Sequence, residues 1–199
     1  MAVTRVEAVP AAFRVAEEAV RAATGRPEFE VSEIAAPEGV APESVALAGD
    51  VRPRSHGVDS VLGTGRFILL HDAEEPEPWG GPFRIVAFAQ APLETEIGID
   101  PFVAEVAWSW LLDALEQGGA RHRAASGTAT KILSTGFGEL AGADGAQLEL
   151  RASWSPADAD PAQLTAHVEA WIELVCLLAG LPPRGETVGL LPQHRAARG

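Results

Sequence analysis

The residue types that most often carry catalysis are few in this chain and far apart. It has a single cysteine, Cys176, and no two of its five histidines stand four residues apart. The histidines are His56, His71, His122, His167 and His194. Zinc ligands usually come in closely spaced pairs, and the sequence has neither such a pair nor a Walker loop nor a G-x-S-x-G elbow. We therefore expect no cofactor, no metal site and no catalytic residue.

One glycine-rich segment does match a known pattern. Gly136, Gly138 and Ala141 fit the dinucleotide-binding sequence G-x-G-x-x-A. That sequence works only between a strand and the first turn of a helix, where backbone N–H groups meet a pyrophosphate. Here it runs into Gly142, Asp144 and a further predicted strand. We interpret it as a glycine-rich hairpin.

His71 and Cys176 can each be interpreted either as a reactive group or as a structural residue. His71 precedes Asp72 at the end of a predicted strand, where the two could form an acid–base couple. The favoured alternative is a surface turn in which Asp72 stabilises the acidic loop that follows. Cys176 lies near Glu173 in a predicted helix, and a reactive thiolate needs an exposed, electropositive setting. We interpret Cys176 as a structural thiol.

Three arginines fall within predicted strands. Arg66, Arg84 and Arg151 would form a positive island suited to an anionic ligand if they shared the solvent-facing side of a sheet. The alternative is that each pairs with an acidic neighbour such as Glu149.

Three of the five tryptophans are candidates for an interaction surface. Trp108 and Trp110 point to different sides of a predicted helix, because residues two apart do not share a helix face. One of them can be core, and the other must find a strand, a ligand or a partner. Trp79 stands before Gly80 in a Gly/Pro-rich loop, where it either folds back as a lid or anchors a partner.

The positions of proline, aspartate and glycine predict three helices, at about 10–24, 100–118 and 160–180. Pro10, Asp100 and Asp160 mark the starts, while Gly25 and Gly180 mark two of the ends. The middle helix is polar only along one narrow stripe, so we predict that it is the central, mostly buried helix.

Alternating segments predict six strands, near 28–32, 45–51, 61–70, 83–90, 128–137 and 147–154. The order is helix, four strands, helix, two strands, helix, or αββββαββα. Short connections favour an α+β fold with a mainly antiparallel sheet that buries one face under helices. We predict a single domain over 1–199, with a compact core at about 10–180 and an extended tail over 181–199.

Composition limits the partners and the compartment. The chain of 199 residues has a net charge of −13 and a pI of about 4.7, whereas nucleic-acid binders show a basic stripe or a domain pI above about 9. Direct nucleic-acid binding is disfavoured. A lone cysteine fits a reducing compartment, the N-terminus lacks a signal-type apolar region, and no apolar run approaches the ~20 residues of a membrane span. We expect a cytoplasmic protein without membrane contact.

Several motifs together resemble a known family. In one-letter code they are MAVTRV (1–6), PAAFR (10–14), TGRFILLHD (64–72), WSWL (108–111), RASW (151–154) and AGLPP (179–183). The chain resembles the members of the family called domain of unknown function 3000, which are small acidic proteins of high-GC Gram-positive bacteria. The resemblance implies no activity, cofactor or catalytic residue, although the family's genes tend to lie near one for a ribonuclease D-like exonuclease. The predicted order of elements is also similar to the type III secretion chaperone-like fold, whose members are typically dimeric and bind polypeptides.

Three hypotheses follow for function. The first is a non-enzymatic interaction module, adaptor or chaperone-like, that forms a homodimer or binds a protein partner through an apolar sheet or helix surface. The second is a small-ligand pocket, enzymatic or not, between the sheet and the central helix, with Arg66 or His71 as polar contacts. The third is a factor that acts near RNA through a partner.

Overall fold

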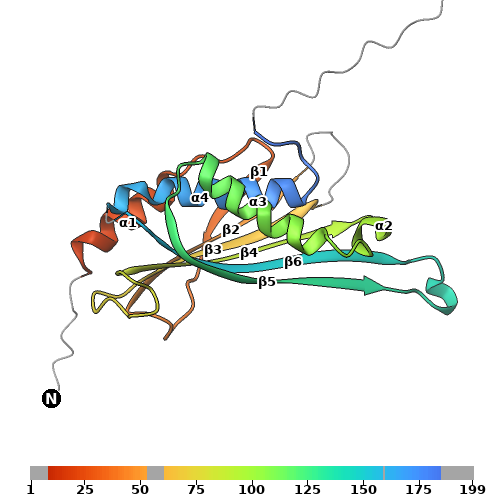
Figure 1. Ribbon diagram of the computed structural model, residues 1–199, viewed down its shortest axis with the longest axis horizontal. Helices are drawn as coiled ribbons and strands as arrows, with labels where there is room; N and C mark the ends of the chain where they lie inside the picture. The colour runs from red at the N-terminus through yellow and green to blue at the C-terminus, as the bar shows by residue number, and fades with distance from the viewer. Residues whose placement is uncertain (1–8, 53–60, 159, 185–199) are drawn as a thin grey trace, which may run out of the picture.

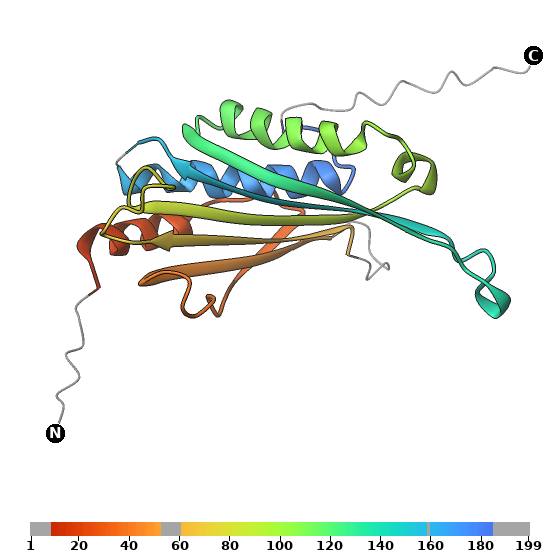
Figure 2. The same ribbon diagram turned by 60° about the horizontal axis from the view of Figure 1, so that its bottom comes forward.

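The computed structural model describes residues 9–52, 61–158 and 160–184 (Figure 1). These residues form a six-stranded antiparallel sheet with the strand order β1-β2-β3-β4-β6-β5, and helices cover one of its faces (Figures 1 and 2). The protein is therefore an α+β protein with an antiparallel sheet, as predicted.

The elements, in chain order, are α1 (Ala11–Ala22), β1 (Phe29–Ile34), β2 (Glu43–Val51), β3 (Gly63–His71), β4 (Phe83–Leu93), α2 (Thr95–Gly98), α3 (Val103–Gln117), β5 (His122–Ser134), the 3-10 turn η1 (Gly138–Leu140), β6 (Gly145–Pro156), the 3-10 turn η2 (Pro161–Gln163) and α4 (Leu164–Leu178). No described helix is long and apolar enough to cross a membrane.

Alternation along the strands separates the two faces of the sheet. On β3, Phe67 and Leu69 are fully buried under the helices, while Arg66 points to the other side and is exposed. The same period of two runs through β4 and β6, because successive side chains of a strand leave on opposite faces. One face is therefore core, and the other faces water.

The central helix is α4, not the helix that the sequence predicted. Ten of the fifteen residues of α4 are buried, and the helix packs between α1 and α3 over β3 and β4 (Figure 1). In α3 only four residues are buried, and Phe102 before it, Val106 and Trp110 stay exposed. The prediction was wrong because composition shows how apolar a helix is, but not how many of its sides have neighbours.

Trp171 fixes α4 on the sheet. Its indole N–H donates to the backbone carbonyl of Phe88 on β4 at 3.1 Å, and the ring packs edge-on against Phe29. The ring can approach the strand because Gly65 has no side chain: a Cβ there would lie 2.9 Å from Trp171 and 2.7 Å from Val175. Helix–sheet packing thus requires a glycine at position 65.

Several predicted boundaries need correction. The first helix ends at Ala22, and Gly25 does not adopt the left-handed conformation that we expected of it. Asp160 accepts from the backbone N–H of Ala162 at 3.0 Å as predicted, but it caps η2, and α4 begins at Leu164. Strand β5 begins at His122, well before the predicted start. The prediction missed its first half because that part is rich in Ala, Gly and Ser and shows no alternation of polar and apolar residues.

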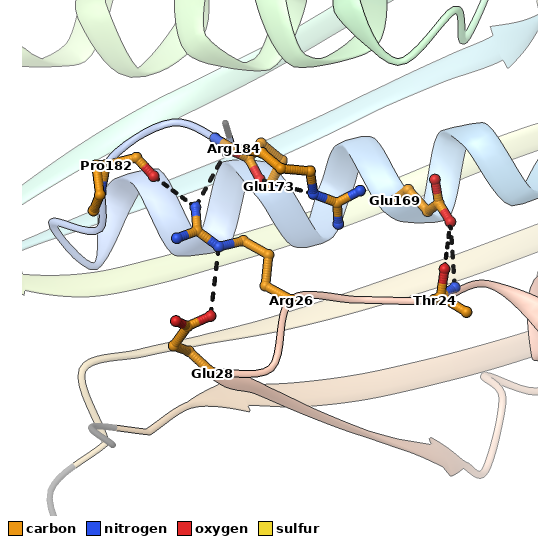
Figure 3. A network of polar contacts seen from close by, with 7 residues as sticks. All are labelled: Thr24, Arg26, Glu28, Glu169, Glu173, Pro182 and Arg184. Carbon is orange, nitrogen blue, oxygen red and sulfur yellow. Dashed lines mark hydrogen bonds and ion pairs between the residues drawn. The ribbon is translucent and has the colours of Figure 1, made fainter. Parts of the chain in front are cut away.

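The last described residues fold back on α4 instead of extending away. Arg26 donates to the carbonyl of Pro182 at 2.7 Å and to Glu173 at 3.4 Å (Figure 3). The backbone N–H of Arg184 donates to the same Glu173 oxygen at 2.8 Å, and Arg26 also lies 3.7 Å from Glu28. This network joins the residues before β1 to α4 and to residues 181–184; the remainder of the predicted tail, residues 185–199, lies outside the described part.

We predict that Gly65→Ala lowers the free energy of unfolding by about 1–3 kcal/mol, because the added methyl group forces Trp171 or Val175 away from the sheet. The matched control is Gly145→Ala in β6, where a Cβ meets no atom within 4 Å. Chemical denaturation of both variants measures the difference. Equal effects of the two substitutions would show that the Trp171 contact is not tight.

Candidate functional site

The face of the sheet away from α1, α3 and α4 carries a row of side chains that crosses the central strands. Arg66 of β3 stands opposite Phe88 of β4, and Phe88 stands opposite Arg151 of β6. Two arginines thus flank one aromatic ring at the strand spacing of about 4.8 Å. The register of the sheet creates this arrangement from residues far apart in the sequence.

A hollow of about 470 Å³ lies over this row. Ile68 and Val86 form the apolar lining on one side. They are the next pair on the same face of the sheet after Arg66 and Phe88. Its polar lining comes from Thr64, Arg66, Gln90 and Arg151. The site therefore offers an apolar floor between cationic and hydrogen-bonding rims.

The side chains of both flanking arginines are exposed. Among the described residues Arg66 makes no ion pair, and its side chain is exposed. The guanidinium of Arg151 lies 5.7 Å from the centre of the Phe88 ring, within cation–π range, and 3.5 Å from Glu149 of its own strand. Since that pair is exposed, it contributes little and leaves Arg151 available.

Arg84 extends the positive surface along β4. Its guanidinium donates to the hydroxyl of Ser153 at 2.6 Å, to that of Ser155 at 3.3 Å and to the carbonyl of Ala124 at 3.1 Å. A bulge in β5 between Arg123 and Ser126 accompanies this contact, with Ala124 at φ +51°. Partial burial lowers the pKa of Arg84, and no described carboxylate forms an ion pair with it. Its charge is held by neutral oxygens alone.

The three arginines singled out from the sequence therefore share the open face of the sheet. Among the described residues, the expected alternative of pairing with acidic neighbours applies only to Arg151, whose partner Glu149 is on the same strand and not across from it. Whether this face binds an anion remains a prediction.

His71 belongs to a different environment. It stands five residues after Arg66 on β3 and hence on the opposite, helix-covered face. Its Nδ1 lies 2.8 Å from a carboxylate oxygen of Glu43, and its ring contacts Phe13 and Phe83. The prediction of a surface position was wrong, and Arg66 and His71 cannot line one pocket between the sheet and a helix.

Asp72 does stabilise the loop after β3. Its carboxylate accepts from the backbone N–H of Glu74 at 2.9 Å, and its own N–H donates to the carbonyl of Pro82. The acidic loop is thus closed locally, which confirms the interpretation of Asp72 as a turn residue and gives it no role beside the His71 ring.

The candidate tryptophans do not gather in one place. Trp108 packs on the edge strand, where a Cβ at Gly127 would lie 2.7 Å from its ring. Trp110 is 36% exposed on α3, and Trp79 is half-buried in the loop between β3 and β4. Of the two tryptophans on this helix, Trp108 packs against strand β5, while Trp110 contacts no described partner.

Two buried titratable groups have structural roles. Burial raises the pKa of the Cys176 thiol to about 12, which agrees with a structural cysteine. His167 accepts a hydrogen bond from the indole N–H of Trp154 through Nδ1 at 3.0 Å. Burial, with a smaller effect of His122, lowers the pKa of His167 to about 4 against the opposing effect of Asp158.

The glycine-rich motif of Gly136 and Gly138 lies in the turn that joins β5 to β6, followed by one 3-10 turn and a strand. It is a hairpin, as predicted, and it lacks the helix that a dinucleotide site requires. Within residues 9–52, 61–158 and 160–184, no group of three or more His, Cys, Asp or Glu side chains is placed to hold a metal ion.

Sequence reasoning missed the residues that give the open face its shape. Phe88, Ile68 and Val86 were assigned to strands but not to the site, although their parity relative to Arg84 and Arg66 placed them on the same face. No sequence pattern indicated that Ser126 and Ser153 contact Arg84, because their proximity to it depends on the pairing of β4, β6 and β5.

Comparison with known proteins identifies a family whose function is not established. A family model described as "Protein of unknown function (DUF3000)" matches residues 9–188, in agreement with the resemblance that the sequence motifs carry. None of the curated proteins and none of the solved structures compared with the chain matches it.

We predict a pH dependence of stability that comes from His167. The pKa of His167 is about 4 in the folded protein and 6.5 for an ordinary histidine, which represents the unfolded chain. The contribution of His167 to the free energy of unfolding is therefore complete above pH 6.5. It is lost as the pH falls toward 4, at about 1.4 kcal/mol per pH unit. His167→Gln keeps an acceptor for Trp154 but does not titrate.

The measurement is chemical denaturation of both proteins at several pH values between 7 and 4. Carboxylates contribute equally to both proteins, so the difference isolates His167. Parallel curves for the two proteins would contradict the prediction.

Proposed function

The chain belongs to the DUF3000 family, and we propose from its own surface that it is a non-enzymatic interaction module. It binds an acidic segment of a protein partner, with one apolar side chain, across the open face of the sheet. The observation that carries the proposal is the row Arg66–Phe88–Arg151 over the hollow. A cytoplasmic location is part of the same proposal.

Charge complementarity supports an acidic partner. The chain has a net charge of −13, and yet three arginines share this face, two of them without an ion pair among the described residues. Guanidinium groups bind carboxylates in a forked geometry and tolerate contact with aromatic rings. A cationic face on an acidic protein attracts a short acidic segment and orients it.

The spacing supports an extended segment. Side chains two residues apart in an extended chain leave on the same side, about 6.6–6.8 Å apart. A sequence Glu-x-Leu-x-Glu that crosses the strands can therefore place leucine over Phe88 and one glutamate near each of Arg66 and Arg151. Its carboxylates would meet the rim of the hollow and its leucine the floor.

The same charges disfavour two other occupants. In a symmetric dimer centred on Phe88, the arginines of both copies would face each other, which is unfavourable. A long nucleic acid would extend past this face to the acidic remainder of the surface, while screening over about 8–10 Å lets a short segment experience only the local charge.

A small anionic ligand is the second candidate, because the volume of the hollow falls within the range of about 300–1,000 Å³ typical of ligand sites. The hollow lies on the opposite side of the sheet from the pocket that the sequence predicted. Its position on an open sheet face suits an elongated partner better than an enclosed small molecule.

We predict that a fluorescent peptide with Glu-Ser-Leu-Ser-Glu at its centre binds the protein, while the same peptide with lysine for glutamate does not. Arg66→Glu together with Arg151→Glu should weaken binding by about tenfold or more, since two attractive charges become repulsive. Fluorescence anisotropy measures affinity, and NMR chemical-shift mapping locates the peptide. Added salt should weaken the complex.

The matched control is Arg14→Glu, a charge reversal on the exposed side of α1. It should change the affinity less than about twofold, because α1 lies on the other side of the sheet. Equal binding of the lysine peptide, tighter binding of a single-stranded oligonucleotide, or an equal effect of Arg14→Glu would each refute the proposal.

A further inference from the structure

Exposed large apolar side chains are concentrated in one stretch of the chain. Nine of the fifteen such residues among those described lie between residues 97 and 140. They are Ile97, Ile99, Phe102, Val106, Trp110, Ile132, Leu133, Phe137 and Leu140. This stretch runs from the end of α2 through α3 and β5 to η1, the turn before β6.

The hairpin forms a projecting arm, defined here as residues 134–145. Strand β4 pairs with β6 only as far as Leu93 opposite Ala146, so no described third strand supports the hairpin beyond that point. Figure 2 shows this end of the hairpin projecting past the remainder of the sheet. At its end Phe137 is 80% exposed and Leu140 68% exposed. An isolated aromatic ring in this position is costly in water.

The second apolar surface is a stripe along α3, defined as Phe102, Val106 and Trp110. These residues stand four apart and therefore lie on one side of the helix, next to the flank that packs on α4. Phe102 is 63% exposed, Val106 40% and Trp110 36%. No described segment of the chain covers the stripe.

We propose that two copies of this chain exchange arms, with Phe137 and Leu140 of each copy packed on the α3 stripe of the other. A two-fold axis makes an interface reciprocal, so a chain that carries both an apolar projection and an apolar acceptor is self-complementary. A fully exposed aromatic side chain can bury about 150–250 Å², and Phe137 and Phe102, at 80% and 63% exposed, keep most of that area available, while Leu140, Val106 and Trp110 add to it. The arm and stripe together thus approach the roughly 800 Å² per copy of a standard interface.

The charges around the two surfaces predict how salt acts on the dimer. Glu105 and Asp113 flank the stripe, and Glu139 lies in the arm. Contact between the copies therefore brings like charges together, and salt should screen their repulsion and strengthen the dimer. Peptide binding on the open face has the opposite salt dependence, so failure of one proposal does not entail failure of the other.

The test is the mass of the full-length protein by light scattering after size exclusion, over a range of concentrations and salt. The expected mass is twice the chain mass of 20.8 kDa. Phe137→Glu in the arm and Val106→Glu in the stripe should each give a monomer. Val40→Glu and Val15→Glu, at positions exposed by 53% and 44% elsewhere, should leave the dimer intact.

Reciprocity gives a sharper result. A mixture of the Phe137→Glu and Val106→Glu proteins can form a heterodimer in which one arm–stripe contact is intact, whereas neither variant alone retains any intact contact. The mixture should therefore dimerise although its components do not. Circular dichroism of each variant checks that the fold is unchanged.

A monomeric wild-type protein at every concentration would overturn the proposal. So would a dimer that persists in both variants, or one that Arg66→Glu and Arg151→Glu disrupt instead, because the contact would then lie on another face. Failure of the mixed variants to associate would exclude arm exchange specifically.

Discussion

The packing of α4 against the middle of the sheet is the constraint on which the other features depend. Trp171 lies against β3 where Gly65 has no side chain, and its N–H reaches the carbonyl of Phe88. With α4 held there, α1 and α3 pack on its two sides, and all three long helices lie on one face. The opposite face has no described cover. The backbone of Phe88 thus anchors the core, while its ring faces the hollow.

The structure separates two surfaces of different physical character. The open face of the sheet combines Phe88 with three arginines, of which only Arg151 forms an ion pair with a described carboxylate, so it favours an anionic, partly apolar partner. The α3 stripe and the arm are apolar and bordered by acidic residues, so they favour an apolar surface and high salt. The two surfaces can act independently, because one lies on the sheet and the other on the helix layer and the projecting hairpin.

Most of the local structure was predictable, and the errors share a cause. The alternation of β6, the apolar stripe of α4 and the turn at Asp72 all depend on near neighbours in the sequence. The central position assigned to the middle helix and the surface position assigned to His71 depend on which other elements lie above them. His71 is buried because Phe13 of α1 packs over it, and nothing within β3 indicates that.

The sequence by itself determined the type and the order of the main elements, the absence of common catalytic motifs, and the parity that places Arg66, Arg84 and Arg151 each on one side of its own strand. These are local properties, set by the periods of two and 3.6 residues and by capping residues. Only the tertiary structure decided that the three parities coincide on one open face, that serines surround Arg84, and that α3 keeps an exposed stripe. Those outcomes depend on strand order and helix placement, which arise from the competition of all the apolar faces for a single core.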